Sequence, residues 1–414
     1  MTRSILSTAR AGAGSLLVAS MLGACADSPT APTATVLRTP SAQVISNTSD
    51  ADWAQRISGK TGNGSVYAIF VPHNWNGDVV YYAHGFADVA APIALPDNVD
   101  GLRNDLGARG YAVAYSSFSE NGFAVKDGIQ RTQQLRGLFA ENTGLTANRS
   151  YLIGQSLGGA IALAIAEQRS SQFAGVMPVC GMVGGSKLQT QYLGNVRSLF
   201  DALFPNVGVA GSTLVMPMNV NPVTQIQLPA QQAVFGNNFA GVPRLVSMAL
   251  SPQTPLPTNA LNNYPMMFES LATALVFHAR GINDILDRTN GATPFGNIST
   301  VYTSAAWDAA TQAGVNATIS RYTIAPSADN YFTHNWTPSG NLQIPTLTLR
   351  NALDPVMPAF HQAALQNAAN AAGSSGMLAS GIATAQYGHC VWQPGEVAAS
   401  FDKLVLWVTQ GIKP

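Results

Sequence analysis

A serine in a tight turn is the first residue of this sequence that could do chemistry. The stretch "YLIGQSLGGA", residues 151–160, places Ser156 between an apolar run and a run of small and aliphatic residues. A serine hydroxyl attacks a carbonyl carbon when a neighbouring base takes its proton. The spelling GQSLG fits G-x-S-x-G, for which about 0.3 chance matches are expected in a chain of this composition. The context favours a nucleophile, because glycines two before and two after the serine permit a sharp turn from a buried strand into a helix.

The base and the acid that such a serine needs are expected late in the chain. Six histidines are present, and we expect His389 in "QYGHCVW" to be the base because it follows the last expected core strand. Asp354 in "IPTLTLRNALDPVMP" ends an apolar run and could fix the tautomer of that imidazole. In isolation Asp354 fits a helix N-cap better. The chain order Ser156, Asp354, His389 is the one expected for a nucleophile on a strand-to-helix elbow.

The attacked carbonyl oxygen becomes an anion, which is stabilised by two N–H donors. Leu157 would supply one N–H as the residue after the nucleophile. Phe86, in the strand-exit stretch "YYAHGFAD", would supply the other. His84 in that stretch is expected to brace the loop rather than to transfer protons.

A third loop is expected to border the site. The stretch "SSFSENGFAV", residues 116–125, follows an apolar strand run, and the loops at this end of a parallel sheet carry ligands. Glu120 and Asn121 are therefore candidate substrate contacts. The alternative is a solvated turn built on Asn121 and Gly122.

The elements that must position these residues alternate between two kinds. Apolar runs typical of strands cover residues 65–72, 78–86, 111–118, 150–156, 174–181 and 345–352, and helix-length patterns cover 96–109, 126–142 and 159–170. Such alternation predicts a mainly parallel sheet covered on both faces. Residues 185–341 break the alternation with helical stretches and loops, so we expect them to form an inserted cap in a discontinuous core of residues 51–184 and 342–414.

The composition excludes several classes of partner. The chain has 414 residues, 46% of them hydrophobic, and 21 Lys and Arg against 21 Asp and Glu. No net field attracts nucleic acid or an anionic membrane surface. The sequence shows no H-E-x-x-H, no paired Cys-x-x-Cys and no G-x-G-x-x-G, so we expect neither a metal nor an organic cofactor.

The N-terminus resembles an export signal. Residues 1–24 combine a basic start with a short apolar stretch, and "LGAC" ends at Cys25 in the manner of a bacterial lipobox. This resemblance implies cleavage before Cys25, a lipid on its thiol, and anchoring to the cell envelope at the periplasmic face or the cell surface. An ordinary signal peptide would instead release a soluble protein. Residues 25–50 are rich in Pro, Ser and Thr and are expected to form a disordered tether, and the lipid would be the only membrane contact.

Four short motifs together resemble the α/β-hydrolase superfamily. They are "HGF" at 84–86, "GQSLGG" at 154–159, "LDPVMP" at 353–358 and "GHC" at 388–390, in family order, and the resemblance covers roughly residues 60–184 and 342–414. The stretches "VPHNWNGDVVYYAHGF" and "GYAVAYSSFSENGFAV" are similar to secreted bacterial hydrolases of the tannase-like, feruloyl-esterase-like and prolyl-oligopeptidase-like kinds. The family implies an eight-stranded, mostly parallel sheet with helices on both faces and a lid after the sixth strand.

Cys180 and Cys390 are expected to form a disulfide. If Cys25 carries lipid, these two remain, and the oxidising setting of an exported chain favours pairing. Cys180 ends the strand after the nucleophile strand, and Cys390 follows the expected base, so both should lie on one face. The tannase-like enzymes have a comparable bond, although there one cysteine lies beside the nucleophile. Two free buried thiols are the alternative.

These features favour hydrolysis of a small-molecule or polymeric ester through an acyl-enzyme on Ser156. A serine peptidase or amidase would use the same residues. A non-catalytic surface binding protein on the same scaffold would be expected to lack one of the three triad residues, and none is missing.

Overall fold

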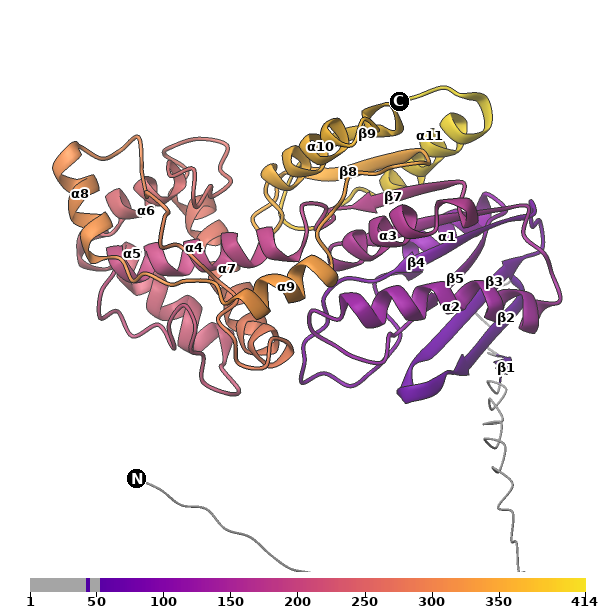
Figure 1. Cartoon of the computed structure of the whole chain (residues 1–414), viewed down its shortest axis with the longest axis horizontal. Coiled ribbons are helices and arrows are strands. Elements are labelled where there is room, and N and C mark those ends of the chain that lie inside the picture. The colour runs from indigo at the N-terminus through magenta and orange to yellow at the C-terminus, as the bar shows by residue number, and fades with distance from the viewer. Residues whose placement is uncertain (1–41, 45–52) are drawn as a thin grey trace, which may run out of the picture. The chain divides into compact units, whose positions relative to one another are not determined.

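The computed structural model describes residues 42–44 and 53–414, and these described residues belong to one compact unit. Within the described residues, nine strands form a single sheet in the order β1-β2-β3-β5-β4-β6-β7-β8-β9 (Figure 1). The strands are β1 (Ala42–Val44), β2 (Trp53–Lys60), β3 (Val66–Pro72), β4 (Asp78–Ala83), β5 (Ala112–Ser116), β6 (Arg149–Gln155), β7 (Gly175–Val179), β8 (Thr346–Leu353) and β9 (Leu378–Tyr387).

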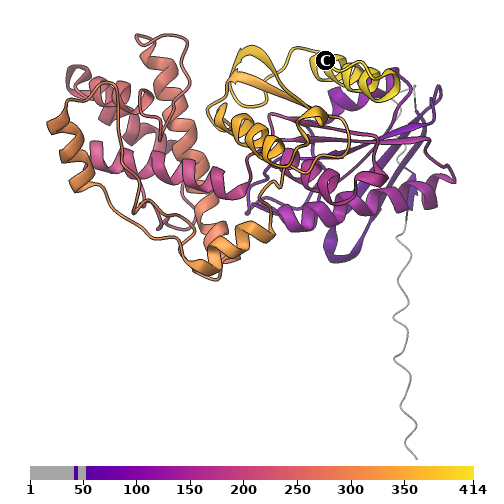
Figure 2. The ribbon, with the colours of Figure 1, turned by 45° about the horizontal axis from the view of Figure 1, so that its top comes forward.

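The helices fall into two groups. Those of the α/β part are α1 (Asp100–Ala108), α2 (Val125–Thr143), α3 (Leu157–Gln168), α10 (Phe360–Ala371) and α11 (Glu396–Gln410). Those between β7 and β8 are α4 (Ser186–Leu203), α5 (Leu228–Phe239), α6 (Val242–Ala249), α7 (Tyr264–Arg288), α8 (Ala309–Thr318) and α9 (Pro326–His334). Figures 1 and 2 show this second group gathered on one side of the sheet.

The expected fold class is confirmed: the sheet is mostly parallel, and helices cover it. Strands β4 to β9 pair in parallel, whereas the pairings β1–β2, β2–β3 and β3–β5 are antiparallel. The sheet has nine strands where the resemblance implied eight. The extra strand is β1, a three-residue edge strand inside the segment expected to be a disordered tether, and because of it the insertion follows the seventh strand of the chain.

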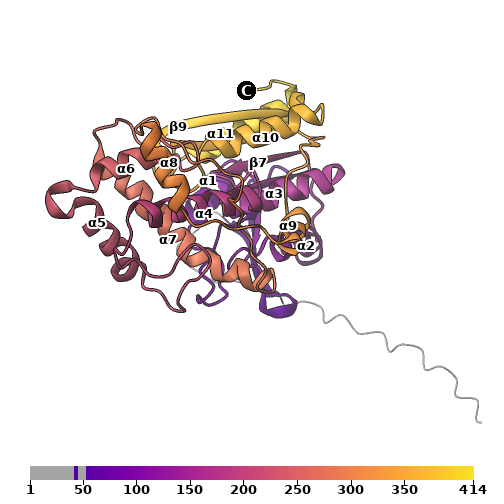
Figure 3. The same ribbon diagram turned by 60° about the vertical axis from the view of Figure 1, so that its left-hand side comes forward.

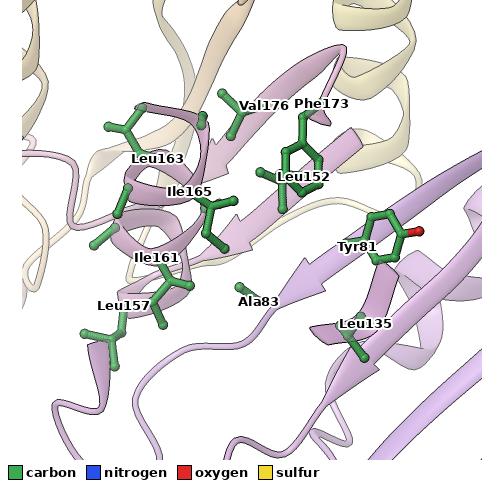
Figure 4. Packing of buried hydrophobic residues seen from close by; sticks show 14 of the residues in the cluster. Tyr81, Ala83, Leu135, Leu152, Leu157, Ile161, Leu163, Ile165, Phe173 and Val176 are labelled. Atoms are coloured by element: carbon green, nitrogen blue, oxygen red, sulfur yellow. The ribbon is translucent and has the colours of Figure 1, made fainter. Parts of the chain in front are cut away.

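Alternate residues of the central strands enter two different cores. Tyr81 and Leu152 pack with α2, α3 and α10 on one face, while Tyr82 and Ile153 pack with α1 and α11 on the other. Figure 4 shows Ile161 of α3 directed toward the strands, in the first of these cores. Burial on both faces explains why these strands are continuous apolar runs in the sequence.

The inserted region, residues 185–341, has a hydrophobic core of its own. This core joins α4, α5, α6 and α7, and Figure 3 views these helices from their own side. The division of the chain into core and cap domains stays a prediction. No helix among the described residues is long and apolar enough to cross a membrane. The predicted signal peptide and the lipid site Cys25 lie outside the described residues.

Two buried histidines should make stability depend on pH. Burial lowers the pKa of both His278 and His361 to about 3, so the folded protein keeps them neutral where the unfolded chain protonates them below about pH 6.5. The unfolded state then binds more protons, so the free energy of unfolding should fall as pH drops from about 6.5 toward 3, by about 1.4 kcal/mol per pH unit for each histidine.

Urea unfolding at pH 7, 6 and 5 checks this pH dependence. The variant His278→Gln keeps a donor for the Thr213 carbonyl, which His278 Nε2 contacts at 2.9 Å, and removes one titrating group. The stability difference between wild type and variant should therefore shrink with decreasing pH, and a difference independent of pH would contradict the buried neutral state.

Candidate active site

Ser156 lies in a strained turn between β6 and α3. Its backbone has φ 55° and ψ −118°, a left-handed region that a residue with a side chain rarely adopts. A Cβ on Gly154 would collide with the carbonyl oxygen of Gly158, and a Cβ on Gly158 would collide with the carbonyl oxygen of Ala83. The two glycines of the motif are therefore required by the close approach of strand, turn and helix, and the turn presents the serine at the end of the sheet.

The structure brings Ser156, His389 and Asp354 into contact. His389 Nε2 lies 2.8 Å from Ser156 Oγ, and His389 Nδ1 lies 2.8 Å from Asp354 Oδ2. Because a carboxylate oxygen accepts, Nδ1 carries the proton and Nε2 is free to accept from the serine hydroxyl. The side chain of Asp354 is 1% exposed and that of His389 is 14% exposed, so the carboxylate is buried while the imidazole borders the surface.

The loop at residues 84–86 runs against the serine. A Cβ placed on Gly85 would lie 3.2 Å from Ser156 Cβ. His84 stacks on Phe118 with 3.8 Å between ring centroids, and its Nδ1 lies 2.7 Å from the Gly85 carbonyl oxygen, as expected for a brace. Burial lowers the pKa of His84, which keeps it neutral.

Leu157 opens α3, where the backbone N–H groups have no partner within the helix. The oxyanion roles of Phe86 and Leu157 stay predictions.

The predicted disulfide between Cys180 and Cys390 is present, with 5.4 Å between the Cα atoms. It joins the residue after β7 to the residue after His389. The two sulfurs and a ring nitrogen of His389 lie within 4.8 Å of one another, which is close enough for three ligands of one metal ion. Since both sulfurs are bonded to each other, neither is a thiolate ligand.

Ser156 follows β6, Asp354 follows β8 and His389 follows β9, all at the end of one mostly parallel sheet. This order on a strand-to-helix elbow defines a known architecture. The chain has the α/β-hydrolase fold.

No protein-family model matches this chain, and no curated protein sequence matches it. Solved structures similar to it include feruloyl esterase B from Aspergillus oryzae, at 15% identity and a TM-score of 0.41, covering 90% of this chain and 88% of that one. A carboxyl esterase from Bacillus coagulans matches at 12% identity and a TM-score of 0.41, covering 86% and 98%. Lipase A from Candida antarctica matches at 11% identity and a TM-score of 0.46, covering 90% and 82%.

Two phenylalanines that sequence reasoning did not single out, Phe277 and Phe123, form an aromatic cluster with Phe86 beside His389. Phe277 of α7 meets the His389 ring edge to face at 6.1 Å and approaches the ring of Phe86 at 6.5 Å. Phe86 in turn meets Phe123 at 5.4 Å. In the sequence, Phe277 is one apolar residue among many in a long helix, so no local signal distinguishes it from ordinary core. The inserted region thus places an aromatic side chain on the proposed base of the hydrolase fold.

A cavity of about 420 Å³ lies beside the elbow on the face of the sheet that carries α1 and α11. Gln155, the residue before Ser156, lines it together with Tyr82 and Trp392. Tyr82 donates a 2.7 Å hydrogen bond to Gln155 Oε1. Ser156, Asp354 and His389 are not among the residues that line this cavity.

Glu120 and Asn121 contact the inserted region. Arg288 of α7 donates to Glu120 Oε2 at 2.9 Å and to the Asn121 carbonyl oxygen at 2.8 Å, and it pairs with Asp284 at 3.0 Å. Asp284 also accepts from the Phe123 N–H at 2.6 Å. These contacts attach the loop at residues 116–125 to α7. A direct contact with substrate stays a prediction.

These contacts predict that replacing Arg288 destabilises the fold more than replacing Glu120. Arg288→Met should destabilise the fold by about 3 kcal/mol, because it leaves the buried Asp284 without its charge partner. Glu120→Gln should cost under about 1 kcal/mol, since that carboxylate is 53% exposed. Urea unfolding of both variants checks the ranking. Equal destabilisation by the two substitutions would show that the ion pair of Arg288 with Asp284 contributes no more to stability than its ion pair with Glu120.

Proposed function

We propose that this protein is a serine hydrolase that cleaves carboxylic esters through an acyl-enzyme on Ser156. The observation that carries the proposal is the continuous hydrogen-bonded series from Ser156 Oγ through the His389 imidazole to Asp354. A distance of 2.8 Å is within the range for direct proton transfer from hydroxyl to imidazole.

In the first step His389 Nε2 takes the serine proton as Ser156 Oγ attacks the ester carbonyl. The imidazolium then gives that proton to the leaving alkoxide, and the acyl group remains on the serine. Asp354, which accepts from Nδ1, holds the ring in the required tautomer and stabilises its positive charge. The N–H groups of Leu157 and Phe86 would donate hydrogen bonds that stabilise the negative charge on the carbonyl oxygen.

In the second step a water molecule replaces the leaving alcohol. His389 takes a proton from the water as it attacks the acyl carbon, and it returns that proton to Ser156 Oγ when the acid product leaves. Phe277 and Phe86 supply apolar surface beside these reacting groups, which suits an acyl or aromatic substituent more than a charged one.

Pre-steady-state kinetics with matched p-nitrophenyl esters and p-nitroanilides test this proposal. An ester hydrolase should release a burst of p-nitrophenol equal to the enzyme concentration and hydrolyse the anilide at least about a hundredfold more slowly. Comparable kcat/KM values for ester and anilide would favour the amidase alternative. The absence of turnover of either substrate class across acetyl, octanoyl and aromatic acyl groups would contradict the proposal.

We further propose, from residues 1–25 alone, that the enzyme is exported and anchored by lipid on Cys25. Metabolic labelling with a palmitate analogue should mark the wild-type chain and not the Cys25→Ser variant. Labelling of neither would favour the soluble secreted alternative.

A further inference from the structure

Two peptide groups hold the carboxylate of Asp354. Its Oδ1 accepts from the N–H of Val356 at 2.8 Å and from the N–H of Met357 at 2.9 Å. A peptide group is planar and rigid, so each N–H moves together with the C=O of the residue before it. The carbonyl ends of these two groups belong to Pro355 and Val356. Whatever fixes those two carbonyls therefore also fixes the donors to Asp354.

Helix α4, the first helix of the inserted region, binds both carbonyls. Tyr192 Oη donates to the Pro355 carbonyl oxygen at 3.1 Å, and Gln189 Nε2 donates to the Val356 carbonyl oxygen at 3.0 Å. The two side chains are three positions apart, which places them on one face of the helix. Gln189 is 1% exposed and Tyr192 3% exposed, so water does not compete for either bond.

The amide of Gln189 is itself oriented by His361 of α10. The Gly184 N–H donates to His361 Nδ1 at 3.2 Å, so the ring proton is on Nε2, which donates to Gln189 Oε1 at 2.8 Å. The oxygen of the amide therefore faces His361, and its nitrogen faces the Val356 carbonyl. Burial lowers the pKa of His361 to about 3, which keeps the ring neutral and this arrangement intact near neutral pH.

We propose that Gln189 and Tyr192 are positioning residues for Asp354, so that the inserted region sets the geometry of the triad. This inference rests on the proposed function. A hydrogen bond to a carbonyl oxygen polarises the peptide group and strengthens the bond that its N–H donates. Since α4 also packs against α7, which carries Phe277, the inserted region contacts both the base and the loop that holds the acid.

The variant Gln189→Met tests the inference because it keeps the volume and removes both hydrogen bonds of the amide. The matched control is Gln191→Met on the same helix, whose amide donates to the Gly296 carbonyl oxygen at 2.7 Å, away from the acid loop. Gln189→Met should lower kcat, and the rate at which a fluorophosphonate modifies Ser156, by about tenfold to a hundredfold with little change in KM. Gln191→Met should leave both rates within about twofold of wild type.

A double-mutant cycle separates positioning from a general loss of structure. In an Asp354→Asn background the carboxylate is gone, so adding Gln189→Met should cost less than about twofold. Tyr192→Phe keeps the ring packed on Phe360 and should lower both rates by about threefold to tenfold. This variant tests the inference if Gln189→Met does not fold.

Equal effects of Gln189→Met and Gln191→Met, or an undiminished effect in the Asp354→Asn background, would overturn the inference. These outcomes are distinct from failure of the proposed function. If wild-type Ser156 did not react with the fluorophosphonate, the hydrolase proposal itself would fail. If wild type reacted and both Gln189→Met and Tyr192→Phe reacted equally fast, only the positioning role would fail.

Discussion

Replacing His389 by alanine is expected to lower kcat by about four orders of magnitude while leaving the fold intact. Without the imidazole, Ser156 Oγ has no acceptor for its proton, and the leaving alkoxide has no donor. The ring is partly exposed at the edge of the site, so its removal opens little core volume. Steady-state hydrolysis of an accepted ester, together with the melting temperature from circular dichroism, measures the two effects separately.

The matched control is His334→Ala. His334 lies at the end of α9, is exposed, and has its Nδ1 2.8 Å from the Asn330 carbonyl oxygen of its own helix. Its loss should leave kcat unchanged. Activity of His389→Ala within tenfold of wild type would remove His389 from the role of base.

Breaking the Cys180–Cys390 bond should lower both stability and activity. The bond closes a loop of 210 residues, so its removal should cost about 2 to 4 kcal/mol of unfolding free energy. It also frees the loop that carries His389, so kcat should fall by about tenfold or more through misplacement of the imidazole. Urea unfolding and ester kinetics of the Cys180→Ala, Cys390→Ala double variant measure the two losses.

Thiol titration provides the control for that experiment. A Cys25→Ser chain denatured without reductant should show no free thiol, and after reduction it should show two. Two free thiols before reduction would contradict the bond, and full activity in the double variant would contradict its role in placing His389.

The sequence predicted the parts of the fold whose signal is local. The six apolar runs became β3 to β8, because strands buried on both faces must be apolar throughout. Strand β2 was missed because "WAQRISGK" is largely polar, and β9 because "LASGIATAQY" is dominated by small residues. Both lie toward the edges of the sheet, where burial constrains the sequence less.

The candidate site likewise contains residues that could be predicted from the sequence and residues that could not. Ser156 could be located because its turn demands two glycines, and Asp354 and His389 because their order after the serine follows from the topology. Gln189 and Tyr192 could not be found in this way. They meet the acid loop from 167 and 163 residues away and are ordinary polar and aromatic residues within a helix pattern.

The central claim, that Ser156 is an activated nucleophile, is tested most directly by a fluorophosphonate probe followed by mass spectrometry of the digested protein. An activated serine forms a covalent phosphonate ester, whereas an ordinary serine hydroxyl does not react. The account predicts one adduct per wild-type chain, on the peptide that contains Ser156, and no adduct on Ser156→Ala. Equal labelling of the two proteins, or a wild-type adduct on any other residue, would contradict it.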